Sequence, residues 1–174
     1  MTETTQLSPA AIGFNPQRAM DFAKSELFER TFKEGMGLVE ESAAYLDGPG
    51  RAASKRLSRA AALAYAGESM RLTTRLMQVA SWLLVQRAMR EGEIPLAEAA
   101  GEKYRLIARE TQSPPAIAGA EDVPAALKTM AMRGAAIFER VRRLDEIIYG
   151  AGGEAAAGNG VSGQMAKLAA AFGR

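Results

Sequence analysis

The side chains that most often perform catalysis are absent from this sequence of 174 residues. It contains no histidine and no cysteine, which excludes an imidazole base, a thiolate nucleophile and the usual ligands of zinc. Carboxylates remain, and four pairs lie close together in the sequence: Glu40 with Glu41, Asp145 with Glu146, Glu26 with Glu29, and Glu98 with Glu102. Adjacent residues diverge by about 100° on a helix, and the last two pairs have basic neighbours. We interpret all four pairs as solvated surface and expect no enzyme activity, metal or cofactor.

One glycine-rich string matches a nucleotide-binding motif. Residues 158–163 read GNGVSG, which satisfies the pattern G-x-G-x-x-G. That motif binds dinucleotides only between a strand and a helix N-terminus, with an acidic residue about 20 positions later. The sequence supplies neither the strand nor the acidic residue, so we do not interpret the string as a binding site.

Basic residues offer a further binding chemistry. The segment 51–91 holds eight basic and two acidic residues, and 16–46 holds four basic and six acidic residues. We therefore expect the two segments to attract one another. The basic excess is densest at Arg51, Lys55, Arg56 and Arg59. These residues are either a solvated helix face or a site for an acidic partner, protein or nucleic acid.

A helix-turn-helix interpretation is less well supported. Ala97 and Gly101 have the spacing of the turn in such regulators, but Lys103 stands where the second helix needs an apolar anchor.

The elements that must position these residues are helices. Asn15 and Pro16 predict a helix start and Gly50 a stop, which gives helices over 16–46 and 51–91. A heptad pattern predicts a third helix over 123–149, and 95–110 allows a short one before Ser113-Pro114-Pro115. No segment alternates like a strand. We predict an all-α, antiparallel three-helix bundle over 15–149, with disordered ends at 1–14 and 150–174.

Segment 51–91 has apolar residues on three sides. One predicted stripe holds Tyr65, Leu72, Leu76, Val79 and Leu83, and a second holds Leu63, Ala66, Met70, Met77, Leu84 and Ala88. We assign both to the bundle. The third side, Trp82, Val85 and Met89, is left over, because helices of about 46 and 40 Å cannot cover one of about 60 Å. We assign it to a homodimer interface, with cover by residues 93–122 as the alternative.

The C-terminal segment offers one more candidate contact. Of residues 150–174, 15 of 25 are glycine or alanine, a composition that cannot bury enough surface to fold alone. Met165, Leu168 and Phe172 have the spacing of a small amphipathic turn that folds when bound. We treat these three residues as a partner-docking hypothesis, against the alternative of an inert end.

Several strings resemble those of a known family. Residues 80–93 read ASWLLVQRAMREGE, and LAEA, EKYRL and RVRRLD follow at 96–99, 102–106 and 140–145. Together they resemble the alphaproteobacterial regulator of CtrA degradation family over about 16–149. The strings contain no catalytic motif, so the resemblance offers no active site.

The resemblance implies a dimeric three-helix bundle that serves as an adaptor for the ClpXP protease, delivering cell-cycle substrates such as CtrA. It also implies a response-regulator partner and a cyclic-di-GMP-binding adaptor partner. The sequence has no signal peptide or membrane span, so we expect a cytoplasmic protein, with recruitment to a cell pole left open. The alternatives are a helical nucleic-acid-binding regulator and a purely structural scaffold.

Overall fold

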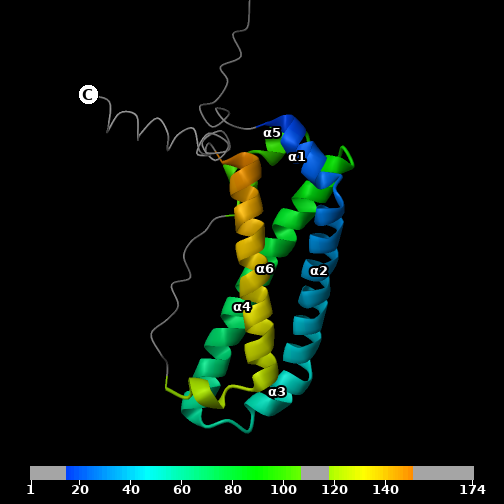
Figure 1. The fold of residues 1–174 in the computed structure, drawn as a ribbon. Helices are drawn as coiled ribbons and strands as arrows, with labels where there is room; N and C mark the ends of the chain where they lie inside the picture. The colour runs from blue at the N-terminus through cyan, green and yellow to red at the C-terminus, as the bar shows by residue number, and fades with distance from the viewer. Residues whose placement is uncertain (1–14, 107–117, 151–174) are drawn as a thin grey trace, which may run out of the picture.

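The computed structural model describes residues 15–106 and 118–150, and all the regular structure within them is helical. Three long helices, α2, α4 and α6, lie side by side (Figure 1). Short elements close the two ends: α1 and α5 at one end, α3 at the other (Figure 1). The elements in chain order are α1 (Pro16–Ala23), α2 (Glu26–Asp47), α3 (Pro49–Ser54), α4 (Arg59–Arg90), α5 (Leu96–Ala99), the 3-10 turns η2 (Glu102–Tyr104) and η3 (Ala120–Asp122), and α6 (Ala125–Tyr149). The all-α prediction is confirmed.

Two predicted helices are each divided by a serine that caps the second part. Asn15 caps α1 as predicted, its Oδ1 accepting from the backbone N–H of Arg18 at 3.2 Å. Ser25 then starts α2 by accepting from Phe28 at 3.2 Å, and Ser58 starts α4 by accepting from Ala61 at 3.2 Å. A serine Oγ satisfies an N–H that the first helical turn leaves free. The predicted continuous helices over 16–46 and 51–91 were therefore wrong at these breaks.

The helices do not all alternate in direction, so the antiparallel prediction was wrong. Helix α2 runs against α6, since Glu41 pairs with Arg133 at 2.7 Å and Glu34 with Arg140 at 2.5 Å. Helix α6 runs parallel to α4 (Figure 1). A Cβ built on Gly119, before α6, would lie 2.5 Å from the backbone nitrogen of Ala61, at the start of α4.

The parallel arrangement follows from the connector. At the other end of the bundle Trp82 of α4 hydrogen-bonds Asp145 of α6 at 2.8 Å. Arg105, which bonds Asp145, and Gly119, which lies against Ala61, are therefore at opposite ends of α4. In an antiparallel bundle α6 would begin near the end of α4 instead.

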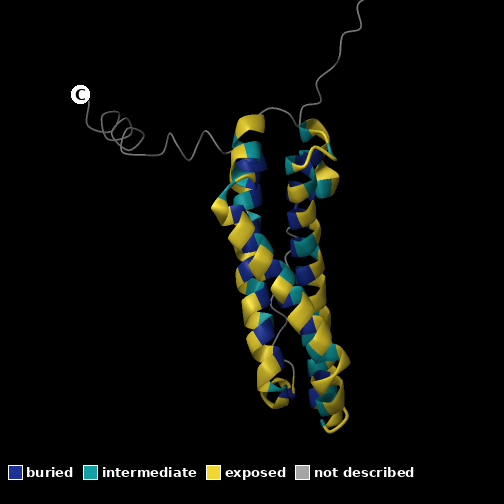
Figure 2. Ribbon diagram, turned by 90° about the vertical axis from the view of Figure 1, so that its right-hand side faces the viewer, coloured by how far each residue is buried: buried dark blue, intermediate teal, exposed yellow. Residues whose placement is uncertain are grey.

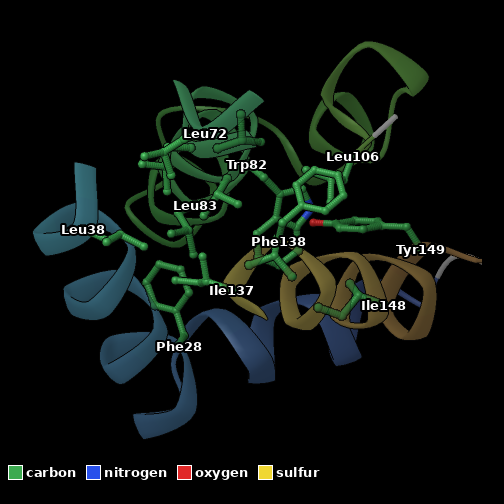
Figure 3. Close-up of a cluster of buried hydrophobic side chains, with 14 of the residues drawn as sticks. Phe28, Leu38, Leu72, Trp82, Leu83, Leu106, Ile137, Phe138, Ile148 and Tyr149 are labelled. Carbon is green, nitrogen blue, oxygen red and sulfur yellow. The ribbon is translucent and has the colours of Figure 1, made fainter. Parts of the chain in front are cut away.

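The core is built on one face of α4, as predicted. Leu72, Leu76, Val79 and Leu83 are buried where α4 meets α2 and α6, and Figure 3 shows Leu72 and Leu83 among them. Two glycines bring the neighbouring helices close. A Cβ on Gly35 of α2 would lie 2.8 Å from Leu83 Cδ1, and a Cβ on Gly134 of α6 would lie 2.7 Å from Leu72 Cδ1. The three long helices therefore share one core.

The other two faces of α4 are reversed relative to the prediction. Trp82, Val85 and Met89 are at most 8 % exposed within the single chain, because α1, α5 and residues 104–106 fold over them. Phe22 of α1 packs on Trp82 with ring centroids 5.8 Å apart. The assignment of these three residues to a dimer interface was therefore wrong. The stated alternative, cover by residues 93–122, is correct only in part, because α1 and α6 also cover them.

The predicted charge attraction between the first two long helices is limited to one end of the pair. Glu29 of α2 pairs with Arg90 of α4, whereas Glu34 and Glu41 reach α6 instead. Each exposed pair of this kind contributes at most about 1 kcal/mol. Within residues 15–106 and 118–150, no helix combines the length and the apolar character that crossing a membrane requires.

Candidate protein-interaction surface

The main feature of the surface is an apolar stripe along the outside of α4. It consists of Leu63, Met70, Met77 and Leu84, whose exposed fractions range from 48 to 72 %, and we call it the α4 stripe. Exposed residues follow the outer faces of the long helices in Figure 2. The members are seven residues apart, the spacing of a heptad seam, and span about 32 Å. These residues were predicted to lie in the bundle, and that prediction was wrong.

Small side chains separate the large members of the α4 stripe. Ala66 and Gly67 lie between the first two, Thr73 and Thr74 between the middle two, and Ala80 and Ser81 between the last two. Small residues between large apolar ones let a second helix approach closely and receive its side chains between them. A regular, solvent-exposed apolar row of this kind is typical of a protein-protein contact.

A cleft of about 260 Å³ adjoins the stripe at Met77. Its walls come from α4 and from the connector, and its lining residues are Met77, Gln78, Ser81, Trp82, Lys103, Tyr104, Arg105 and Leu106. Pockets that enclose drug-sized molecules have volumes of about 300–1,000 Å³. The cleft is therefore better suited to one side chain of a partner than to a nucleotide.

Beneath the cleft, a buried polar cluster fastens the connector to the bundle. Asp145 is 3 % exposed and accepts from Trp82 Nε1 at 2.8 Å and from Arg105 Nε at 2.9 Å. Arg105 Nη1 also donates to the carbonyl oxygen of Tyr149 at 2.9 Å. We call Trp82, Arg105 and Asp145 the clamp. The interpretation of Asp145 as solvated surface was wrong, while Glu146 is exposed as expected.

Tyr149 continues this cluster toward α4. Its hydroxyl donates to Gln86 Oε1 at 2.6 Å, and Gln86 is itself buried. Figure 3 shows the ring between α4 and α6, facing Trp82 and Leu106. Burial raises the pKa of Tyr149 to about 12.

The raised pKa of Tyr149 predicts a loss of stability in alkali. The folded state keeps its proton up to about pH 12, whereas the unfolded state loses it near pH 10, so folding is favoured fully below pH 10 and less as pH rises to 12. At pH 9 we expect Tyr149→Phe to lower the free energy of unfolding by about 1–3 kcal/mol, because Gln86 loses its donor. Between pH 10 and 12 the variant should lose less stability than the wild type in urea titrations. Parallel pH profiles would contradict this assignment.

The basic residues are exposed but do not form one helical stripe. Arg51 belongs to α3, Lys55 and Arg56 to the link that follows, and Arg59 to the first turn of α4. Arg51 lies 3.9 Å from Asp47, and the structure describes no ion pair for the other three. They therefore make one end of the molecule positive, but they do not form a single helix face that could enter a DNA groove.

The described part of the chain contains no second helix that a helix-turn-helix motif would need after Gly101. After Gly101 the chain forms the three-residue turn η2 and then extended backbone at Arg105. Such a turn cannot present a row of side chains to a DNA groove.

No metal site emerges from the carboxylates. In the part of the chain that the structure describes, no three acidic residues converge on a point that could hold an ion. The docking hypothesis on Met165, Leu168 and Phe172 and the string at 158–163 lie outside the described residues.

Sequence reasoning missed the α4 stripe as a surface and missed the clamp entirely. The seven-residue spacing from Leu63 to Leu84 was a usable signal for the stripe. Nothing local signals the clamp, because Arg105 and Asp145 are forty positions apart.

Comparison with known proteins relates the chain to a family and to a solved structure. The model of a family described as "Protein of unknown function (DUF1465)" matches residues 19–172. The crystal structure of RcdA from Caulobacter crescentus CB15 is 56 % identical in sequence, with a TM-score of 0.60, and the match covers 75 % of this chain and 97 % of that one. No curated protein matches.

Proposed function

The chain belongs to the family described as protein of unknown function (DUF1465), and from its similarity to RcdA we propose that it is a non-enzymatic adaptor in the regulated degradation of CtrA. The α4 stripe is the observation that carries this proposal. A row of large apolar side chains that is 48 % or more exposed is costly in water unless a partner covers it. The molecule is therefore organised for contact.

The proposed mechanism is concentration of a substrate at the protease. An adaptor that holds a substrate and a protease assembly together turns capture into an intramolecular event, which strengthens weak contacts without new chemistry. We assign the ClpXP protease, a response-regulator partner and a cyclic-di-GMP-binding partner to this assembly, as the family resemblance implies. We also assign a homodimer, with the contact moved from Trp82 to the α4 stripe.

The proposal predicts faster proteolysis in a reconstituted reaction. CtrA, ClpXP, the response-regulator partner and the cyclic-di-GMP-binding partner are mixed with and without the full chain, and loss of CtrA is followed over time. We expect the chain to raise the initial rate severalfold when CtrA is limiting, because capture is then the slow step. A substrate that ClpXP degrades without help is the control and should be unaffected. An unchanged CtrA rate would mean that the chain is no adaptor for this substrate.

The same reaction tests the C-terminal hypothesis. Replacing Met165, Leu168 and Phe172 together by alanine should abolish the stimulation if they dock on a partner. Full stimulation by this variant would assign the docking to the helices instead.

Nucleic-acid binding through Arg51, Lys55, Arg56 and Arg59 receives no specific support. A salt-dependent DNA shift that is lost when the four are replaced by alanine would favour it.

A further inference from the structure

The cleft between α4 and the connector is rich in hydrogen-bond donors, and the described residues that line it include no acidic side chain. Lys103 and Arg105 carry donors only, three N–H groups on the ammonium and five on the guanidinium. Gln78 and Ser81, on the α4 wall, can donate as well. Such a lining complements a negatively charged group that only accepts hydrogen bonds, which among protein side chains is a carboxylate.

Arg105 is held in position before any ligand arrives. Its Nε donates to the two carboxylate oxygens of Asp145 at 3.0 and 2.9 Å, and its Nη1 donates to the carbonyl oxygen of Tyr149 at 2.9 Å. Nη2 lies 3.5 Å from the carbonyl oxygen of Asp145. These bonds occupy three of the five N–H groups, and the side chain is still 26 % exposed. The guanidinium can therefore donate to a ligand with little further loss of side-chain entropy.

Lys103 supplies the second positive charge of the cleft. Its side chain is 63 % exposed, and its Nζ donates to Glu98 Oε1 at 3.0 Å and lies 4.5 Å from the centroid of the Tyr104 ring. Glu98 occupies one of the three N–H groups of the ammonium and is not among the residues that line the cleft. The ammonium can therefore donate to a carboxylate in the cleft while it keeps its bond to Glu98.

The apolar part of the lining determines what carries the carboxylate. Met77, Trp82 and Leu106 also line the cleft, so the ligand needs apolar groups next to its charge. Met77 belongs to the α4 stripe as well and is 67 % exposed. A protein that lies on the stripe therefore places its side chains over the cleft. A glutamate side chain combines a carboxylate with two methylene groups and fits both parts of the lining.

We infer that the cleft receives a glutamate side chain of a partner protein, and that apolar residues on either side of this glutamate contact the α4 stripe. The carboxylate accepts from Lys103 and Arg105, and the methylene groups pack against Trp82 and Met77. This inference rests on the adaptor function proposed above and adds the chemistry of one contact.

The charges around the cleft limit the strength of this contact. Both cations already have an acidic partner, Glu98 for Lys103 and Asp145 for Arg105, so binding depends on the remaining donors and not on a net charge. For a short peptide we expect a dissociation constant on the order of millimolar, which rises with salt because Lys103 is exposed. A contact of this strength becomes effective when other contacts of the same assembly add to it.

Nuclear magnetic resonance with two matched peptides tests the chemistry of the ligand. Trp82 is the single tryptophan and its indole N–H bonds Asp145, so its one indole signal reports on the cleft. The full chain, labelled with ¹⁵N, is titrated with acetyl-Leu-Glu-Leu-amide and with the same peptide carrying glutamine. We expect the glutamate peptide to shift this signal and to bind at least about 10-fold more tightly, because its hydrogen bonds are charge-assisted. Equal affinity of the two peptides, or no shift with either, would overturn the inference.

Replacing two lysines in the same way tests the place of binding. Lys103→Met removes one charged donor and should weaken binding of the glutamate peptide about 10-fold, whereas Lys103→Arg should preserve it. Lys33→Met is the control, since Lys33 is also exposed but lies on α2. Circular dichroism verifies that the three variants remain folded. Unchanged affinity of Lys103→Met, or an equal loss in Lys33→Met, would remove the ligand from the cleft.

The same variants in the degradation reaction test whether the glutamate belongs to a protein of the assembly. Lys103→Met should reduce the stimulation of CtrA degradation severalfold, and Lys33→Met should leave it unchanged. If the wild type stimulates degradation and Lys103→Met stimulates it equally, then the assignment of the cleft to a partner is overturned and the adaptor function stands. If the wild type binds the glutamate peptide but does not stimulate degradation, then the adaptor function alone is overturned.

Discussion

Asp145→Ala is expected to lower the free energy of unfolding by about 3–5 kcal/mol, the cost of removing one member of a buried ion pair. The carboxylate accepts from Trp82 at 2.8 Å and from Arg105 at 2.9 Å. Without it the indole N–H loses its acceptor in the core and the guanidinium loses its counter-charge. Since small domains are stable by only about 5–15 kcal/mol, this loss is a large fraction of the total free energy of unfolding. Urea unfolding followed by the fluorescence of Trp82, the single tryptophan, measures it.

The adjacent residue supplies the control for the clamp. Glu146 pairs with Arg142 at 2.5 Å, but its side chain is 59 % exposed, so Glu146→Ala should cost less than about 1 kcal/mol. Equal costs at the two positions would show that the clamp contributes no more than a surface pair. A double variant gives a second test. Arg105→Met combined with Asp145→Leu should lose less unfolding free energy than Asp145→Ala alone, because replacing both partners by apolar residues leaves no unpaired charge.

Gly119→Ala is expected to be the most disruptive glycine replacement in the connector. Gly119 has φ of +85°, where a side chain costs about 1–2 kcal/mol, and a Cβ there would lie 2.5 Å from the backbone of Ala61. Overpacking against backbone adds about 1–3 kcal/mol. We expect a total of roughly 2–5 kcal/mol in urea unfolding.

Gly92 separates the two causes. It has φ of +78° with no atom within 4 Å of an added Cβ, so Gly92→Ala should show the backbone cost alone, about 1–2 kcal/mol. If Gly119→Ala costs no more than Gly92→Ala, then the contact with Ala61 does not hold the connector at the start of α4.

The breaks in the first two predicted helices were foreseeable. Ser25 and Ser58 are both good N-cap residues, and each lies between segments with helical periodicity. Their consequence is large, because the break at Ser25 lets α1 cross over Trp82 instead of extending α2.

The direction of α6 was not foreseeable from local patterns. The connector between Arg90 and Ala125 is long enough to place α6 either way, and the choice depends on contacts at both its ends. Gly119 meets Ala61 at one end, and Arg105 meets Asp145 at the other. Neither contact leaves a trace in periodicity or composition.

The sequence by itself determined the helices, the core face of α4 and the absence of histidine and cysteine chemistry, because these depend on residue identity and on the spacing of neighbours along one helix. Only the tertiary structure decided which apolar faces of α4 remain exposed. Periodicity shows that Trp82 and Met70 lie on different sides of the helix, but it does not show which side a distant segment covers. Burial is a property of the assembled chain, since it depends on where α1 and the connector come to rest.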